Sequence, residues 1–175
     1  KNKIEIPKYI ATYNLYISYK KPGNFIWIPT KHWEESSKFK DVKYKNMIIN
    51  INLTPTFHLN HEDKIYNSGY EKICAPLSYI NQNGDDLFFL NGQVFLKNNS
   101  DECVQAVNEM RNSLLKNDFK ICIPQKERRI IFLNNILGFH ARDIFEEPIE
   151  NVDLSRVMLR MVDVNAEFYP SRLIQ

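Results

Sequence analysis

The sequence predicts a mainly β protein, a sandwich or barrel of short strands with one helix packed outside. Aromatic residues make up 13% of the 175 residues, and such bulky side chains suit pleated sheets better than long helices. Short apolar segments recur along the chain, with turn sequences between them. Helical spacing of apolar residues is clear in one segment only, so we expect one helix among many short strands.

In chain order, the expected strands are residues 9–19, 25–28, 47–53, 56–59, 76–80, 87–90, 94–96, 119–123, 129–133 and 155–164. In the first of them, Tyr13 and Leu15 alternate with more polar residues, which is the period of a strand. Because a Lys-Pro-Gly-Asn turn joins the first two strands, residues 9–28 are expected to form a hairpin. Residues 33–45 are polar and predict a short helix followed by a loop.

The one clear helix is expected at residues 101–116. Cys103, Val107 and Met110 fall at helical spacing there. Ser100 can cap the first turn, and the two acidic residues that follow it suit the positive end of the helix dipole.

Composition limits the kinds of partner. The chain carries 23 basic and 21 acidic residues, and no basic block is interleaved with aromatic residues, so no nucleic acid partner is expected. No apolar run approaches the roughly 20 residues of a membrane span, so no membrane partner is expected either. Three cysteines without a CxxC pair predict a reduced, cytoplasmic protein without a structural zinc site.

The length fits a single domain. The sequence begins at Lys1, without a methionine, and its first residues already read as the middle of a chain. We therefore expect residues 1–175 to form one domain that is incomplete at its N-terminus.

The strand at residues 156–162 has two unlike faces. Because successive side chains alternate, Arg156 and Arg160 share one face, and Leu159 and Met161 share the other. A guanidinium inside a protein needs an anionic partner, best a carboxylate, because an unpaired buried charge is costly. The alternative is an edge strand with both arginines in solvent.

The residues before this strand carry a further pattern. An apolar strand runs into Asn134-Asn135, a short turn follows, and His140-Ala141-Arg142 comes next. With the R-x-x-x-R strand after it, this order resembles the C-terminal signature of the clavaminate synthase-like and taurine dioxygenase-like oxygenases, in which H-G-R follows a D/N-N pair. A looser similarity extends upstream over most of the chain.

The resemblance implies a fold and a chemistry. The fold is a double-stranded β-helix, a jelly roll or cupin-like barrel, and the cofactors are Fe(II) and the co-substrate 2-oxoglutarate. His140 would be the distal histidine of a metal-binding triad of two histidines and one carboxylate. Arg160 would pair with the far carboxylate of 2-oxoglutarate, with Arg156 beside it. Asn135 and Arg142 would support these groups. Without the resemblance, a lone histidine after a strand is a surface or core residue.

Three positions depart from the family's pattern. Arg128-Arg129 replaces the usual Gly-Asp, and Ala141 replaces the glycine of H-G-R. Asn24-Phe25 stands where a threonine often helps to hold 2-oxoglutarate.

The first histidine and the carboxylate of the triad need another source. In the family they lie just before the first strand matched here, which places them upstream of Lys1. Within the sequence, His61 and Asp63 have the required H-x-D spacing, in a polar stretch that otherwise reads as a solvated loop. His32 and His58 are expected at the surface.

We therefore expect an oxygenase that hydroxylates or desaturates a small-molecule substrate, an amino acid or a molecule made from one. Two alternatives stay open. One is a non-catalytic jelly-roll binding module or partner subunit that has lost its metal. The other is a β-sandwich lectin or cupin-like module whose arginines bind another anion.

Overall fold

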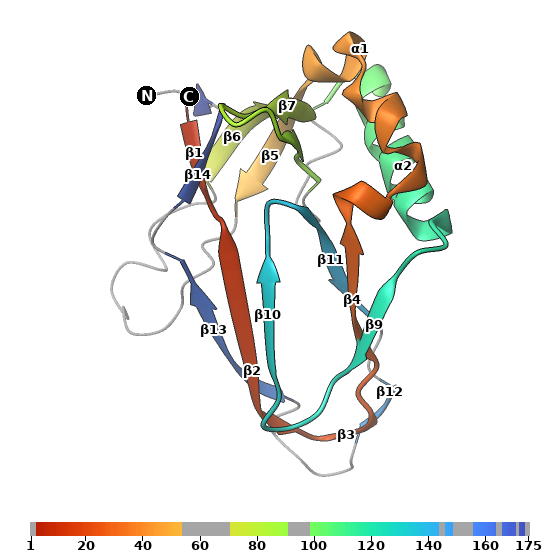
Figure 1. Cartoon of the computed structure of the whole chain (residues 1–175), viewed down its shortest axis with the longest axis vertical. Coiled ribbons are helices and arrows are strands. Elements are labelled where there is room, and N and C mark those ends of the chain that lie inside the picture. Colours follow the sequence, from red (N-terminus) through yellow and green to blue (C-terminus); the bar gives the residue numbers. More distant parts are fainter. Residues whose placement is uncertain are drawn as a thin grey trace. The chain divides into compact units, whose positions relative to one another are not determined.

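The computed structural model describes residues 3–53, 71–90, 99–143, 146–148, 156–163, 166–170 and 172–173. Its contacts divide the chain into two compact units. The first comprises residues 1–5, 37–115 and 168–175, and the second comprises residues 6–36 and 116–167. Most of the described residues in regular structure lie in strands (Figure 1), which confirms the expectation of a mainly β protein.

The second unit contains two three-stranded antiparallel sheets with the strand orders β10-β2-β13 and β11-β4-β9. The bounds of the first sheet are Tyr9–Ile17 (β2), Ile130–Asn134 (β10) and Arg156–Val162 (β13). Those of the second are Asn24–Pro29 (β4), Ile121–Pro124 (β9) and Gly138–Arg142 (β11). A short pair is formed by Tyr19–Lys21 (β3) and Glu146–Pro148 (β12).

One hydrophobic core lies between these two sheets. The first sheet contributes Ile10 and Ile131, and the second contributes Phe25 with Trp27 packed against it. Burial alternates along β2, as expected for a strand with one face on a core. The two sheets therefore form a sandwich, whereas closure into a double-stranded β-helix stays a prediction.

The hairpin expected over residues 9–28 is wrong, because β2 and β4 belong to different sheets. Thr12 of β2 pairs with Ile131, whereas Phe25 of β4 pairs with Ile123 and with a residue of β11. A Pro-Gly turn sequence specifies a bend and not the partner of the next strand. Here the partners of both strands come from much later in the chain.

The first unit combines small sheets with helices. Its three-stranded sheet is β15-β6-β5, with bounds Arg172–Leu173 (β15), Glu71–Pro76 (β6) and Ile48–Leu53 (β5). Ser78–Ile80 (β7) and Asp86–Phe88 (β8) form a hairpin. Lys3–Pro7 (β1) pairs with Ala166–Pro170 (β14), and both strands contain a boundary between the units. The strands expected at residues 56–59 and 94–96 lie outside the described residues.

The helix expected at residues 101–116 is confirmed as α2 (Asp101–Lys116). The Oγ of Ser100 accepts a hydrogen bond from the backbone N–H of Cys103 at 3.3 Å, which is the predicted cap. Val107 and Met110 are buried on one face of the helix. In the part of the chain that the structure describes, no helix is both long enough and apolar enough to cross a membrane.

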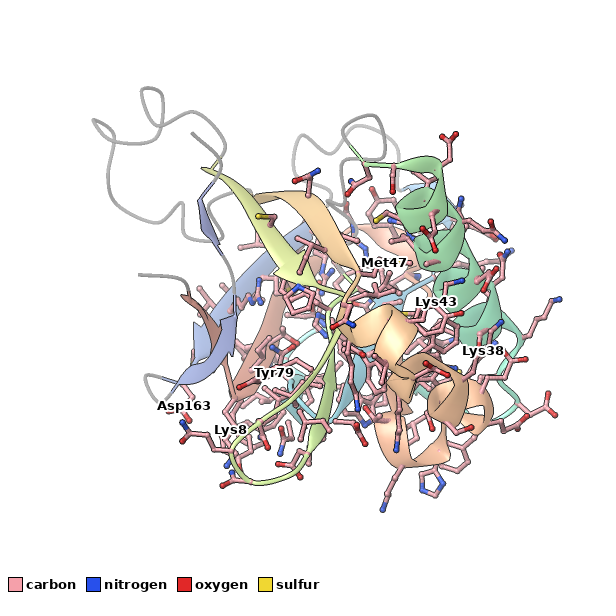
Figure 2. All side chains as sticks on the ribbon, turned by 90° about the horizontal axis from the view of Figure 1, so that it is seen from above. Lys8, Lys38, Lys43, Met47, Tyr79 and Asp163 are labelled. Atoms are coloured by element: carbon pink, nitrogen blue, oxygen red, sulfur yellow. The ribbon has the colours of Figure 1, made fainter. Side chains whose placement is uncertain are left out.

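The polar stretch before β5 is more helical than the short helix and loop expected there. It forms 3-10 turns at Thr30–His32 and Glu34–Lys40 and the short helix α1 (Val42–Lys45). Lys38, labelled in Figure 2, forms an ion pair with Glu109 of α2 at 3.3 Å. This contact joins the turn to the helix within the first unit.

Candidate functional site

His140 and Arg142 lie on β11, a strand that the sequence analysis did not predict. β11 is antiparallel to β4, and the register pairs His140 with Trp27 and Arg142 with Phe25. Paired residues of antiparallel strands project from the same face, and Phe25 and Trp27 face the core. His140 and Arg142 therefore point into the space between the two sheets. There the imidazole of His140 stacks on the ring of Phe25, with the ring centroids 5.8 Å apart.

Arg156 and Arg160 point into the same space from β13. The register pairs Arg160 with Thr12, whose side chain is buried on the inward face of β2. Arg156 donates hydrogen bonds from Nε and Nη2 to Oδ1 of Asn14, at 3.0 and 2.6 Å. Asn14 is buried on that same face of β2. Both arginines are intermediate in exposure, so they line an interior that solvent can still enter.

The positive charges in this space act on one another. Burial lowers the pKa of His140 below 6.5, and the charge of Arg160 lowers it further. Burial also lowers the pKa of Arg156, and the charge of Arg142 adds to that effect. These pairs bring together residues from β11 and β13, so the two strands face each other across the space.

His140 has protein atoms close to its imidazole and is also in contact with solvent. Protein atoms surround the imidazole closely enough to lower its pKa, although the residue remains exposed to solvent. Burial and the charge of Arg160 both favour the uncharged imidazole, which is the form that can bind a metal ion. Because solvent reaches the imidazole, a small molecule could also enter beside it.

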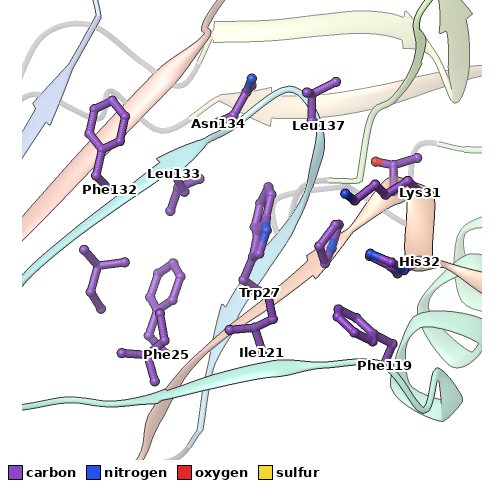
Figure 3. A pocket seen from close by; sticks show the side chains of 14 residues that line it. Phe25, Trp27, Lys31, His32, Phe119, Ile121, Phe132, Leu133, Asn134 and Leu137 are labelled. Carbon is purple, nitrogen blue, oxygen red and sulfur yellow. The ribbon is translucent and has the colours of Figure 1, made fainter.

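A cavity of about 630 Å³ lies between β10 and the strands β4 and β9 (Figure 3). Its walls are mostly apolar, and they include Trp27, Ile121 and Leu133. Phe25 lines this cavity and also stacks on His140, so its ring is a wall common to both. The cavity can therefore hold an apolar group next to the space that contains the charged residues.

The described residues do not by themselves form a metal site here. Among them, no group of three His, Cys, Asp or Glu side chains could hold a metal ion. His61 and Asp63, the internal candidates for the other two ligands, lie outside the described residues, as does His58. His32 is exposed, as expected, and it stacks on Phe119 with the ring centroids 4.2 Å apart.

Two features of the site were not predicted from the sequence. Asn14 was counted only as a polar position in a strand, yet it binds Arg156. Asp143 follows β11 directly, and its Oδ2 accepts hydrogen bonds from the backbone N–H and the Nδ2 of Asn24, at 3.1 and 2.8 Å. Asn135, which was expected to support the site, donates from Nδ2 to the carbonyl of Pro7 at 3.0 Å. Pro7 is the last residue of β1, so that bond holds the chain just before β2 begins.

The sequence matches no protein-family model and no curated protein. Its structure is similar to that of AAD-2 in complex with Mn(II) and N-oxalylglycine, with a TM-score of 0.62 at 9% sequence identity. It is also similar to a taurine dioxygenase from Burkholderia xenovorans, with a TM-score of 0.63 at 13% identity.

These alignments cover nearly the whole of this chain but only part of the similar proteins. They include 93% and 97% of this chain, against 66% and 58% of the AAD-2 and taurine dioxygenase chains. The chain thus spans less than two thirds of the length of either protein. At these identities the likeness establishes the fold, which this chain shares with dioxygenases.

Proposed function

We propose that the protein is an iron(II)- and 2-oxoglutarate-dependent oxygenase of the cytoplasm, with the jelly-roll barrel of that class. The observation that carries the proposal is the position of Arg160 opposite His140. A cation and an uncharged imidazole that share one interior would hold an anionic co-substrate beside a metal ion. The structural likeness to AAD-2, whose crystals contain Mn(II) and N-oxalylglycine, supports the same conclusion.

Arg160 fits the role of an anion-binding residue. No ion pair of Arg160 is seen among the residues that the structure describes. A cation within a protein interior is costly without a counterion, and a guanidinium matches a carboxylate through two parallel hydrogen bonds. We assign the far carboxylate of 2-oxoglutarate to Arg160, with Arg156 beside it.

His140 would be one of three iron ligands. A histidine and a carboxylate must complete the set, either His61 and Asp63 or residues that precede Lys1. A bound iron(II) would supply the redox chemistry that couples decarboxylation of 2-oxoglutarate to hydroxylation or desaturation of a substrate C–H bond. The arginines would orient the co-substrate, and the ring of Phe25 would fix the imidazole of His140. We propose a small-molecule substrate, an amino acid or a derivative of one.

A second candidate function is a non-catalytic anion-binding module with the same fold. It is favoured by the small number of possible metal ligands, because no group of three such side chains occurs among the described residues. The same space contains several arginines that could bind an anion. The two candidates share the binding of a dicarboxylate and differ in metal binding and turnover.

Three variants of the purified protein test the proposal. Arg160→Gln should keep the metal but lose about 30-fold or more in affinity for N-oxalylglycine, because removing one partner of a largely desolvated charge pair costs about 2 kcal/mol or more. His140→Ala should lose iron(II) or its substitute Mn(II) in metal analysis. Arg111→Gln, on α2 of the first unit, is the matched control and should behave as the wild type.

The outcomes separate the candidates. Succinate formed from 2-oxoglutarate by the wild type, and not by His140→Ala, supports the oxygenase. Binding of N-oxalylglycine without metal binding or succinate supports the non-catalytic module. Stoichiometric metal in His140→Ala, or unchanged affinity in Arg160→Gln, overturns the assignment of these residues.

A further inference from the structure

The cavity of the second unit opens between two edge strands. In the described ladders β10 and β9 each stand at the end of their sheet, in the orders β10-β2-β13 and β11-β4-β9. The cavity of about 630 Å³ lies between them and against β4 (Figure 3), and small-molecule sites commonly have about 300–1,000 Å³. Ile121 of β9 and Leu137, in the turn after β10, line it and are 41% and 42% exposed. Solvent, and therefore a ligand, can reach the cavity between these side chains.

The walls differ between the inner part of the cavity and its mouth. In the inner part Phe25, Ile131 and Leu133 are buried, and they belong to the core of the unit. At the mouth Lys31 and His32 are exposed. Apolar walls offer no hydrogen-bond partner to a polar group, whereas an ammonium group attracts an anion. The two parts together match a molecule with an apolar body and an anionic head.

The charge of the lining comes from Lys31. It is the one lysine or arginine among the described residues that line the cavity, and no aspartate or glutamate lines the cavity with them. Figure 3 shows its side chain extending from the turn after β4 toward the side of the cavity that holds Trp27 and Leu137. No ion pair of Lys31 is seen in the described part of the chain. The lining thus complements one negative charge, whereas a dicarboxylate would bring a second charge against apolar walls.

The 3-10 turn that carries this cation is held from two sides. The backbone N–H of Thr30 donates to the carbonyl of Leu137 at 2.9 Å. Nδ2 of the buried Asn117 donates to the carbonyls of His32 and Phe119, at 3.2 and 2.7 Å. The imidazole of His32 also stacks on the ring of Phe119. The polar end of the cavity is therefore formed before a ligand arrives, which lowers the cost of ordering it on binding.

We propose that this cavity is a binding site for a monocarboxylic acid with an aliphatic chain, held with its carboxylate at Lys31 and its chain against Phe25, Ile131 and Leu133. A flexible chain can follow walls that come from three strands. The inference goes beyond the proposed function and does not depend on it. The chain would contact the ring of Phe25 that stacks on His140, so the site is adjacent to the space assigned to the co-substrate and separate from it.

Titration calorimetry of the purified protein with decanoate tests the charge, with decanol as the ligand that has the same chain and no charge. Lys31→Met keeps most of the lysine stem and removes its ammonium group. We expect it to lower the affinity for decanoate by about fivefold, the upper value for an exposed ion pair, and to leave the affinity for decanol unchanged. Lys20→Met is the matched control, because Lys20 is exposed on β3 and does not line the cavity. It should bind both ligands as the wild type does.

Ile121→Trp tests the place of the chain. Ile121 pairs with Trp27, so both side chains face the interior, and a larger ring at position 121 fills part of the cavity. We expect the affinities for decanoate and decanol to fall together by about tenfold, the equivalent of excluding about two CH₂ groups from the cavity. Ile130→Trp is the control, because Ile130 is 61% exposed on β10 and does not line the cavity. It should keep both affinities.

This pattern of affinities supports the site. Unchanged decanoate affinity in Lys31→Met, or undiminished binding in Ile121→Trp, would overturn it, because the acid would then be held elsewhere on the protein. A wild type that does not bind decanoate would overturn it as well. Lys31 and Ile121 are exposed, so we expect both variants to fold, and circular dichroism checks this. Failure of the proposed function looks different, because it is a wild type that binds no N-oxalylglycine, whatever the result with decanoate.

Discussion

His140 is the residue whose chemistry depends most on its neighbours. Its imidazole lies among protein atoms and faces the charge of Arg160, and both effects favour the uncharged form. Its pKa is lower in the folded protein than in the unfolded chain, so the folded state takes up this proton less readily. The contribution of His140 to stability is therefore present above about pH 6.5 and decreases as the pH falls below that value.

Titration of the metal-free protein by NMR should give His140 a pKa below 6.5. In Arg160→Gln the pKa should rise, because the neighbouring charge is gone, but it should stay below 6.5 because burial, the larger cause, remains. A pKa that does not respond to this substitution would show that Arg160 does not face His140.

The side chains of β13 show what alternation predicts and what it does not. The sequence correctly predicted that Arg156 and Arg160 share a face. It could not by itself decide between an inward and an outward arginine face, because burial usually favours apolar residues. In the structure Leu159 and Met161, on the other face, are 40% and 52% exposed. The inward direction of Arg156 depends on its hydrogen bond to Asn14, a residue 142 positions earlier in the sequence.

At the scale of elements, the prediction that depended only on residues within one segment was confirmed. The helix at Asp101–Lys116 was predicted with its bounds because its cap and its apolar spacing lie within the segment. Strand partners are set by distant residues, so the expected hairpin over residues 9–28 failed. β11 was missed because Gly-Phe-His-Ala-Arg shows no clean alternation, and it is a strand because β4 pairs with it.

Gly138 allows this pairing of β11 with β4. A Cβ at Gly138 would lie 2.5 Å from the carbonyl oxygen of Ile28 and 2.5 Å from the indole of Trp27. Because a backbone atom blocks the space, we expect Gly138→Ala to cost about 1–3 kcal/mol of unfolding free energy and to weaken N-oxalylglycine binding. Denaturant unfolding and calorimetry measure the two effects.

Gly84→Ala is the comparison for that prediction. Gly84 has a φ of +84° and no neighbouring atom within 4 Å of the added Cβ. The cost there, about 1 kcal/mol, comes from backbone conformation alone, and binding should not change because Gly84 belongs to the first unit. Wild-type stability in Gly138→Ala would contradict the tight approach of β11 to β4.

Asp143 joins the end of β11 to the start of β4. Its carboxylate accepts two hydrogen bonds from Asn24, and its backbone N–H donates to the carbonyl of Asn24 at 2.9 Å. Asp143→Ala removes the carboxylate bonds and should lower the unfolding free energy by about 1.5–3 kcal/mol, the range for hydrogen bonds to a charged group. Asp118→Ala, at an exposed position, should stay within about 0.5 kcal/mol of the wild type. Equal effects of the two variants would refute this role of Asp143.

At the scale of the whole molecule, the sequence predicted a mainly β protein but not its division into two units. Composition and periodicity indicate the elements, whereas the division depends on which strands share a core. The sandwich of the second unit exists because Ile10 and Ile131 of one sheet meet Phe25 of the other. The same sandwich makes His140 and Arg160 face each other, although their strands, β11 and β13, belong to different sheets. The candidate site is thus a consequence of sheet packing, and a motif search alone could find only its residue types.

Ligand binding at this site should therefore stabilise the folded protein as a whole. A ligand that binds only the folded state adds about 2.7 kcal/mol when its concentration is 100 times its dissociation constant. We expect N-oxalylglycine with Mn(II) to raise the unfolding temperature of the wild type accordingly. The rise should shrink as salt is added, because the attraction is between charges that solvent can reach.

Arg160→Gln should show no such rise at the same ligand concentration, whereas Arg111→Gln should respond like the wild type. Thermal unfolding followed by circular dichroism, at several ligand concentrations, measures the shift. A rise of equal size in Arg160→Gln would mean that the anion binds elsewhere on the protein. A rise that does not depend on salt would mean that charge is not what holds the ligand. Either result would contradict the ligand binding that we assign to this site. Neither would change the strand packing that the structure describes.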